Sequence, residues 1–312
     1  VSALDPTGQR LVHVISRCLA AEPDDRWQTA AELREALRRC LHPRAARLLD
    51  PATGWRRVVK RSNLWVVLLA ALIPNVLAGL FNFQYNRAVL VREETSSAFF
   101  FTQLVVNGIA FPLGIAILIA WWRPLSRRLK EPIPRQVMEP GALDETALQR
   151  SLGIGHFIAL VGVAEWGLAG LVYPLALHFA TDAVSWQMYV HFVASLVLCG
   201  LIAAAYPFFL MSALSVRVFV PALLRDAERS NFACAEFEKL MRRTHGYLFV
   251  AGGVPALAIF AVLLSDRFSP DHNSFPLVVL SSLGVVGFGA TILVFRRIRD
   301  DVASLRDLLT EE

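Results

Sequence analysis

The chain has 312 residues, of which 55% are hydrophobic and only 18% are charged. Its mean hydropathy of +0.48 is higher than a polar, water-exposed surface allows, which excludes a soluble globular enzyme and a disordered chain. The net charge of +5 is modest and the basic residues lie beside apolar segments, so the sequence does not favour nucleic-acid binding.

The first 42 residues are polar and have the pattern of two short helices. Asp5 followed by Pro6 is typical of a helix start, and apolar residues then recur at helical spacing to about residue 21. Thr29 and Glu32 form a capping box that opens a second helix. Two short helices bury too little apolar surface to fold alone, so we expect some apolar side chains to lack a partner. These are Leu11, Val14 and Leu33.

Residues 43–63 are predicted to be a basic juxtamembrane linker. Positive charge beside a membrane helix has two explanations, orientation of the helix during insertion and attraction to anionic lipid headgroups, and the sequence leaves both open. The basic residues are Arg44, Arg47, Arg56, Arg57, Lys60 and Arg61.

Six apolar windows predict membrane-spanning helices, because about 20 apolar residues cross the hydrocarbon layer as a helix. The windows are Leu64–Phe83, Ala98–Trp122, Leu152–Ala180, Trp186–Val216, Tyr247–Ser265 and Phe275–Phe295. We therefore expect an all-α fold in which residues 64–295 form a six-helix transmembrane bundle, surrounded by the lipid bilayer as its partner. Residues 296–312 are expected to form a C-terminal helix outside the membrane.

The positions of the basic residues predict the orientation of the bundle. Of the 31 Lys and Arg residues, all but Arg87, Arg92 and Arg267 lie before the first window, in the second and fourth connections, or after the last window. Because basic segments stay in the cytoplasm, both termini are expected there.

A short identity predicts an internal repeat. The segments Leu77–Leu80 and Leu168–Leu171 both read Leu-Ala-Gly-Leu and lie 91 residues apart, in the first and third windows. We interpret the six windows as three two-helix repeats in the same orientation. Such units differ from the inverted-topology repeats of many secondary transporters.

Glu165 is the acidic residue that the pattern places deepest within a predicted membrane helix. A charge at this depth is costly, so the side chain should face the bundle interior, bind a proton or pair with another group. We consider Gln187 and His191 in the fourth window and Asn107 in the second as partners. Two interpretations stay open: a ligand- or proton-sensing site formed by Glu165, Gln187 and His191, or a neutral Glu165 that hydrogen-bonds between helices.

Other sequence features do not indicate chemistry within this chain. Gly284, Gly287 and Gly289 do not have the spacing of a phosphate-binding loop and are expected to allow close packing of helices. The sequence has no Ser-His-Asp arrangement, Cys-His pair or metal-ligand cluster. We therefore expect no catalytic, cofactor-binding or metal-binding residue here.

The turn between the two N-terminal helices carries a dense motif, since residues 18–33 read CLAAEPDDRWQTAAEL. This motif resembles the end of bacterial eukaryotic-type Ser/Thr protein kinase domains, whose last two helices carry a Cys-Leu pair, an acidic-Pro dipeptide, an Arg and a Ser/Thr-Ala-x-Glu-Leu helix start. The resemblance covers about residues 1–45 and matches Pro23, Arg26, Thr29 and Glu32 to structural positions of the kinase motif. It implies that Arg26 corresponds to an arginine that pairs with a buried glutamate of the activation segment, which is not a catalytic role.

The same resemblance implies that this chain holds the end of a longer kinase. The Gly-rich loop, strand lysine, catalytic loop and Asp-Phe-Gly metal site that phosphoryl transfer needs are not in this sequence. ATP and Mg²⁺ are therefore expected to bind an upstream kinase domain that phosphorylates Ser or Thr of protein substrates. The implied location is the bacterial cytoplasmic (inner) membrane, and the sequence leaves open whether the chain forms a homodimer.

Three functions stay open from the sequence alone. The chain is the C-terminal membrane anchor and sensor of a Ser/Thr protein kinase, a six-helix transporter or channel with a small cytoplasmic head, or a passive anchor or oligomerisation scaffold. The resemblance favours the first. A transporter should gather several polar residues in the middle of the membrane, where the sequence offers chiefly Glu165.

Overall fold

In the computed structural model, the described residues are 5–89, 96–130, 143–180, 186–224, 230–268 and 275–310. They form helices and turns, with no strand among them. Six of these helices are long and apolar enough to span a membrane, which confirms the predicted all-α, multi-pass organisation. They are α5 (Asn63–Val89), α6 (Ser96–Lys130), α7 (Glu145–Ala180), α8 (Trp186–Leu214), α10 (Asn231–Phe268) and α11 (Phe275–Thr310).

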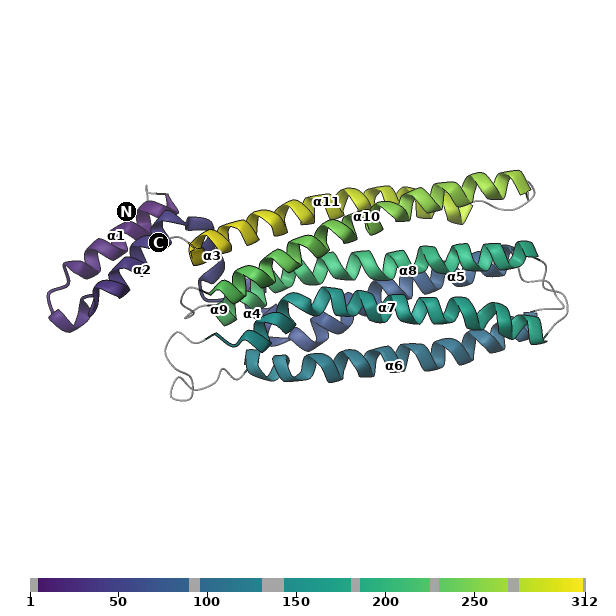
Figure 1. Ribbon diagram of the computed structural model, residues 1–312, viewed down its shortest axis with the longest axis horizontal. Helices are drawn as coiled ribbons and strands as arrows, with labels where there is room; N and C mark the ends of the chain where they lie inside the picture. The colour runs from purple at the N-terminus through teal and green to yellow at the C-terminus, as the bar shows by residue number, and fades with distance from the viewer. Residues whose placement is uncertain are drawn as a thin grey trace.

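Helix α8 lies at the centre of the bundle. It packs against α7, α5 and α10, and 61% of its apolar span is buried. At the edges, α6 packs on α7 and α11 packs mainly on α10, and only 11% of each of these two spans is buried (Figure 1). The apolar surface left on the edge helices suits contact with lipid, because acyl chains are as apolar as the side chains that face them.

The predicted two-helix units pack unequally. Helices α7 and α8 pack along their length, as do α10 and α11, whereas α5 packs mainly on α8 and has few contacts with α6. Two side-chain hydrogen bonds join helices that run in the same direction. Trp166 Nε1–H donates to Asn75 Oδ1 at 2.8 Å, and His156 Nδ1 lies 2.9 Å from the Tyr247 hydroxyl. Both pairs are 91 residues apart, so residues one predicted repeat apart lie at the same depth.

Close packing around the glycines of α11 is confirmed at two of the three predicted positions. A Cβ at Gly284 would lie 3.3 Å from the backbone of Pro255, and one at Gly287 would lie 2.6 Å from the Tyr206 hydroxyl. A Cβ at Gly289 would have no neighbour within 4 Å. Small residues therefore let α11 approach α10 and α8.

Buried polar side chains fasten the helices near the end of the bundle that carries the N-terminal segment. Trp122 Nε1–H on α6 donates to Asn63 Oδ1 at the start of α5 (2.9 Å), and the hydroxyls of Ser151 and Ser215 are 2.8 Å apart. Away from water such groups must find partners within the protein. Ser215 begins a π-helix, Ser215–Phe219, through which α8 continues into α9 (Val220–Leu224).

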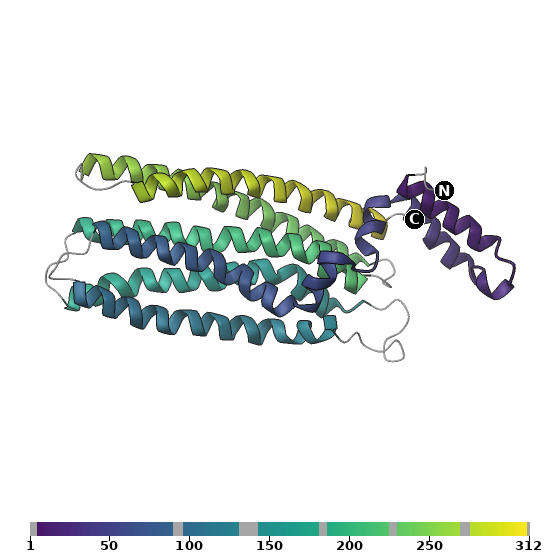
Figure 2. The same cartoon turned by 180° about the vertical axis from the view of Figure 1, so that it is seen from behind.

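The N-terminal segment forms a helical head at one end of the bundle. It consists of α1 (Pro6–Cys18), a 3₁₀ turn (Pro23–Asp25), α2 (Ala30–Leu41), α3 (Pro43–Leu49) and α4 (Gly54–Arg61). The α1–α2 hairpin projects away from the bundle, whereas α3 lies against the C-terminal end of α11 and α4 packs on the π-helix, α5 and α6 (Figure 1, Figure 2). Residues 296–310 continue α11 and do not form a separate helix.

Both predicted helix starts in the head are confirmed. The Asp5 carboxylate accepts a hydrogen bond from the Gly8 N–H (2.8 Å), and the Thr29 hydroxyl accepts one from the Glu32 N–H (3.1 Å). These caps satisfy backbone donors that have no partner within the helix.

The head exposes apolar side chains, but the expected set is wrong at two of its three positions. Val14 is only 5% exposed and Leu33 is half-buried, because α1 and α2 pack against each other. The large apolar side chains that the hairpin exposes are Leu11, Val12, Ile15, Leu19, Leu37 and Leu41. The hairpin therefore exposes several large apolar side chains that nothing in the described structure covers.

Candidate functional site

A small cavity of about 30 Å³ lies between α5, α6 and α7, within the predicted membrane-spanning part of the chain. All three helices contribute polar side chains to its lining. These are Asn75 and Asn82 on α5, Gln103 and Asn107 on α6, and Glu165, Trp166 and Tyr173 on α7. The sequence pattern predicts Glu165 and Asn107, whereas the other side chains come together only through the packing of the helices.

The Glu165 side chain points at the backbone of α6. A Cβ at Gly114 would lie 2.9 Å from Glu165 Cδ and closer still to its Oε1, so the carboxyl group lies against the α6 backbone at a position without a side chain. The Oε1 atom is buried and has no hydrogen-bond partner among the described residues. The carboxyl group therefore has a buried oxygen whose hydrogen-bonding capacity is unused within the described structure.

Other polar side chains of the cavity are already paired. Asn75 accepts a hydrogen bond from Trp166 and donates one to a backbone carbonyl oxygen, and the Tyr173 hydroxyl donates to Gln103 Oε1. Glu165 thus retains capacity to bind a proton or a water molecule, for which the cavity of about 30 Å³ has room. An ionisable side chain with these properties inside a membrane bundle is a candidate functional residue, because buried polar groups with a purely structural role normally have partners.

The predicted partners of Glu165 on the fourth membrane helix cannot be placed. Gln187 and His191 belong to the first turns of α8, but their side chains lie outside the described residues. The described lining of the cavity comes from α5, α6 and α7. The pairing of Glu165 with Gln187 or His191 therefore stays a prediction.

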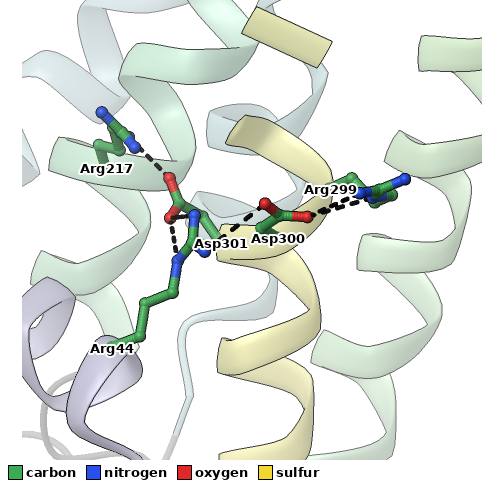
Figure 3. Close-up of polar contacts among 5 residues, drawn as sticks. All are labelled: Arg44, Arg217, Arg299, Asp300 and Asp301. Carbon is green, nitrogen blue, oxygen red and sulfur yellow. Dashed lines mark hydrogen bonds and ion pairs between the residues drawn. The ribbon is translucent and has the colours of Figure 1, made fainter. Parts of the chain in front are cut away.

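A second polar site, which the sequence analysis did not identify, lies where the head meets the bundle. Asp301 on α11 is 2% exposed and accepts hydrogen bonds from two arginines (Figure 3). Arg44 of α3 donates from Nε to Asp301 Oδ1 (2.8 Å), and Arg217 of the π-helix donates from Nε to Oδ2 (2.6 Å). We name Arg44, Arg217, Asp300 and Asp301 the Asp301 junction. It ties together three segments that are far apart in the sequence.

Further charges surround this junction. Asp300 is more exposed than Asp301 and lies 3.6 Å from Arg44 and 3.1 Å from Arg299 (Figure 3). Arg56 of α4 donates to the backbone carbonyl oxygen of Arg217 (3.0 Å). Burial lowers the pKa of Arg56, an effect that Asp50 opposes and the charge of Arg217 strengthens.

These contacts change the interpretation of two basic residues. Arg44 and Arg56, which the sequence assigns to membrane orientation or to lipid headgroups, bind groups of the protein itself. They hold α3 and α4 against the bundle. The remaining basic residues of the linker keep the open interpretation.

A sequence signal for Asp301 does exist. The apolar residues of α11 beyond the membrane are buried at helical spacing: Ile298, Val302, Leu305, Leu308 and Leu309. Asp301 falls on the same face of the helix. An acidic residue at a position where the pattern requires an apolar one is therefore a sign of a buried ion pair.

The residues matched to the kinase motif hold the turn of the α1–α2 hairpin. Pro23 opens the 3₁₀ turn, and the Arg26 guanidinium donates to the carbonyl oxygens of residues 20 and 21 (2.9 and 3.3 Å). Thr29 and Glu32 cap α2, and Glu32 also accepts from the Gln28 N–H (3.2 Å). These side chains are exposed, and their contacts are structural.

Comparison with known proteins finds no family model, no curated protein and no solved structure that matches this chain. Among the described residues, no group of three or more His, Cys, Asp or Glu side chains could hold a metal ion. Function is therefore inferred from the residues and their geometry.

Proposed function

We propose that this chain is the membrane anchor and sensor of a transmembrane Ser/Thr protein kinase, whose catalytic part precedes α1. The observation that carries the proposal is the α1–α2 hairpin, which combines the kinase-like run of residues 18–33 with uncovered large apolar side chains. The most exposed of these are Leu19 and Leu41, which are 78% and 77% exposed. The body of a kinase C-terminal lobe would cover side chains of this kind.

The proposed catalytic part would bind ATP and Mg²⁺ and transfer phosphate to Ser or Thr of protein substrates. This chain supplies no residue for that chemistry and would instead fix the kinase to the bacterial cytoplasmic membrane, with both termini in the cytoplasm. The connections at the opposite end of the bundle are short in sequence (residues 90–95, 181–185 and 269–274), so the stimulus would act within the bilayer. The cavity that contains Glu165 is the proposed place of action.

A continuous set of contacts connects that cavity with the head. Glu165 lies on α7, which packs against the central helix α8. The π-helix that continues α8 carries Arg217, and Asp301 joins Arg217 to Arg44 on α3. Because α3 directly follows α2, a shift of α7 against α8 would reach the kinase-like hairpin through these contacts.

Phosphate transfer by the full-length protein tests the proposal. Membranes that contain the protein with its upstream region should incorporate radioactive γ-phosphate from ATP into Ser or Thr residues, and the 312-residue chain alone should not. A Glu165→Gln variant should change the rate at least about three-fold, whereas Glu145→Gln, the same change at an exposed position on α7, should not. Failure of the full-length protein to transfer phosphate, or a gene with no coding region before α1, would contradict the proposal.

A transporter or channel is the second candidate, and the cavity favours it. Polar side chains from three helices line one intramembrane space with room for water, as a proton-conducting path requires. Proteoliposomes that contain the chain should then conduct protons or small cations, as measured with a pH-sensitive dye inside the vesicles. Glu165→Gln should abolish this flux and Glu145→Gln should preserve it. Flux equal to that of empty vesicles would end this candidate.

A further inference from the structure

A long apolar groove separate from the Glu165 cavity runs between α7, α8 and α10. It has a volume of about 720 Å³ and is lined by residues within 163–171 of α7, 193–204 of α8 and 243–250 of α10. This volume lies within the range of sites that hold small ligands. Its walls are apolar except at one end, where Arg243 is the charged residue of the lining.

The groove runs along the bundle rather than across it. The bond between His156 and Tyr247 sets the register of α7 and α10, and that register places Arg243 at the level of Leu152. From this level to Leu171, at the other end of the lining, is 19 residues, about 28 Å at 1.5 Å per residue. The groove is therefore parallel to lipid chains and extends over most of the roughly 30 Å hydrocarbon layer.

Two glycines in the lining keep the groove open and make no close contact with a neighbouring helix. A Cβ built at Gly167 or at Gly246 would have no neighbour within 4 Å, although both residues line the groove. This differs from Gly155, where a Cβ would lie 2.7 Å from the Phe208 carbonyl oxygen of the neighbouring helix. The space beside Gly167 and Gly246 is thus free for a molecule other than the protein.

Arg243 lies just before the apolar window that begins at Tyr247, so we infer that it lies at the level of the lipid headgroups. It is half-buried and has no hydrogen bond or ion pair with any described residue. The acidic residues that precede it on α10 pair with other cations, Glu236 with Lys239 (2.5 Å) and Glu238 with Arg306 (3.6 Å). The positive charge of Arg243 is therefore uncompensated at the end of an apolar groove.

We propose that this groove binds an anionic phospholipid, with an acyl chain between α7 and α10 and the headgroup phosphate on the Arg243 guanidinium. Guanidinium and phosphate form paired, charge-assisted hydrogen bonds, which suit a cation that lacks a partner in the protein. The apolar walls take up the chain, and the open side of the groove gives access from the bilayer. This site does not depend on the proposed kinase function.

Spin-labelled lipids test the site on the whole chain in phosphatidylcholine vesicles. The probes are phosphatidylglycerol and phosphatidylcholine, each labelled near the end of one acyl chain, and the electron spin resonance spectrum gives the fraction of each that the protein immobilises. The wild-type chain should prefer phosphatidylglycerol. Arg243→Gln should lower this preference about 5- to 10-fold, as expected for the loss of one cation that binds phosphate at the membrane surface.

Matched variants separate the site from general attraction to a basic protein. Arg242→Gln removes the same charge from the neighbouring exposed position and should leave the preference within two-fold of wild type. Gly246→Leu or, if that variant unfolds, Gly167→Leu fills the groove and should reduce the immobilised fraction of both probes. Gly108→Leu on α6 adds the same side chain where a Cβ also has no neighbour within 4 Å, and should have no effect.

Three results would overturn the proposal. One is an equal loss of preference in Arg242→Gln and Arg243→Gln. Another is a wild-type chain that immobilises both lipids equally, which indicates a groove that holds an acyl chain without recognising the headgroup. The third is a wild-type chain that immobilises neither probe, as expected if a second copy of the protein occupied the groove.

Discussion

Replacing Asp301 by asparagine should destabilise the contact between head and bundle. The variant removes the negative charge that Arg44 and Arg217 share and leaves two guanidinium groups facing a neutral amide. Truncating one partner of a buried ion pair costs about 3–5 kcal/mol. The side chains of Arg44 and Arg217 are 39% and 31% exposed, so water compensates part of the loss. We therefore expect a cost of about 3 kcal/mol, near the lower limit of that range.

Thermal unfolding of the purified chain in detergent measures this cost. A loss of about 3 kcal/mol should lower Tm by about 6–12 °C. Asp300→Asn is the matched control, because Asp300 is the adjacent residue, is 41% exposed and should lower Tm by less than about 2 °C. Combining Arg44→Gln with Asp301→Asn should cost less than the sum of the two single changes, by about 1–2 kcal/mol. Equal Tm values for Asp300→Asn and Asp301→Asn would refute the reasoning.

Two further predictions concern the packing of the membrane helices. Gly155→Ala should lower Tm by several degrees, because its Cβ would lie 2.7 Å from the Phe208 carbonyl oxygen, whereas Gly153→Ala meets nothing within 4 Å and should not. Asn63→Ala leaves the buried Trp122 Nε1–H without its acceptor and should cost about 1–3 kcal/mol in the free energy of unfolding, measured by denaturant titration in detergent. Similar Tm values for the two glycine variants, or an Asn63→Ala variant as stable as wild type, would contradict these predictions.

The six membrane helices could be predicted because each spans an apolar window of sufficient length, a property of local sequence. Their neighbours could not be predicted in the same way. The repeat predicts that α5 pairs with α6, whereas α5 packs mainly on α8. Nearly all exposed faces of these helices are apolar, so hydrophobicity does not specify which faces meet. Close contacts at glycines and hydrogen bonds such as Trp166 to Asn75 specify them instead, and both depend on the arrangement in three dimensions.

The Glu165 cavity and the Asp301 junction also differ in how far local sequence predicts them. Glu165 could be identified because a carboxyl group within an apolar window stands out from its surroundings. Asp301 follows the basic run of residues 296–299, where an acidic residue is typical of a solvated surface. It is buried only because Arg44 approaches from 257 positions away. Asp301 lies on the same helix face as the buried Ile298 and Leu305, and this alignment can be recognised in the local sequence. That Asp301 forms a buried ion pair, however, depends on the distant Arg44.

The π-helix Ser215–Phe219 makes the protein unusually sensitive to the loss of one residue. Its wider turn holds an additional residue, so α9 is rotated by about 100° relative to its position in an unbroken α-helix. It also carries the carbonyl oxygen of Arg217 that Arg56 binds. Deleting one residue here would be expected to restore a regular helix, leave the apolar span intact and turn Arg217 away from Asp301. Such a protein would insert into the membrane normally, but its head would no longer be held in the same orientation on the bundle.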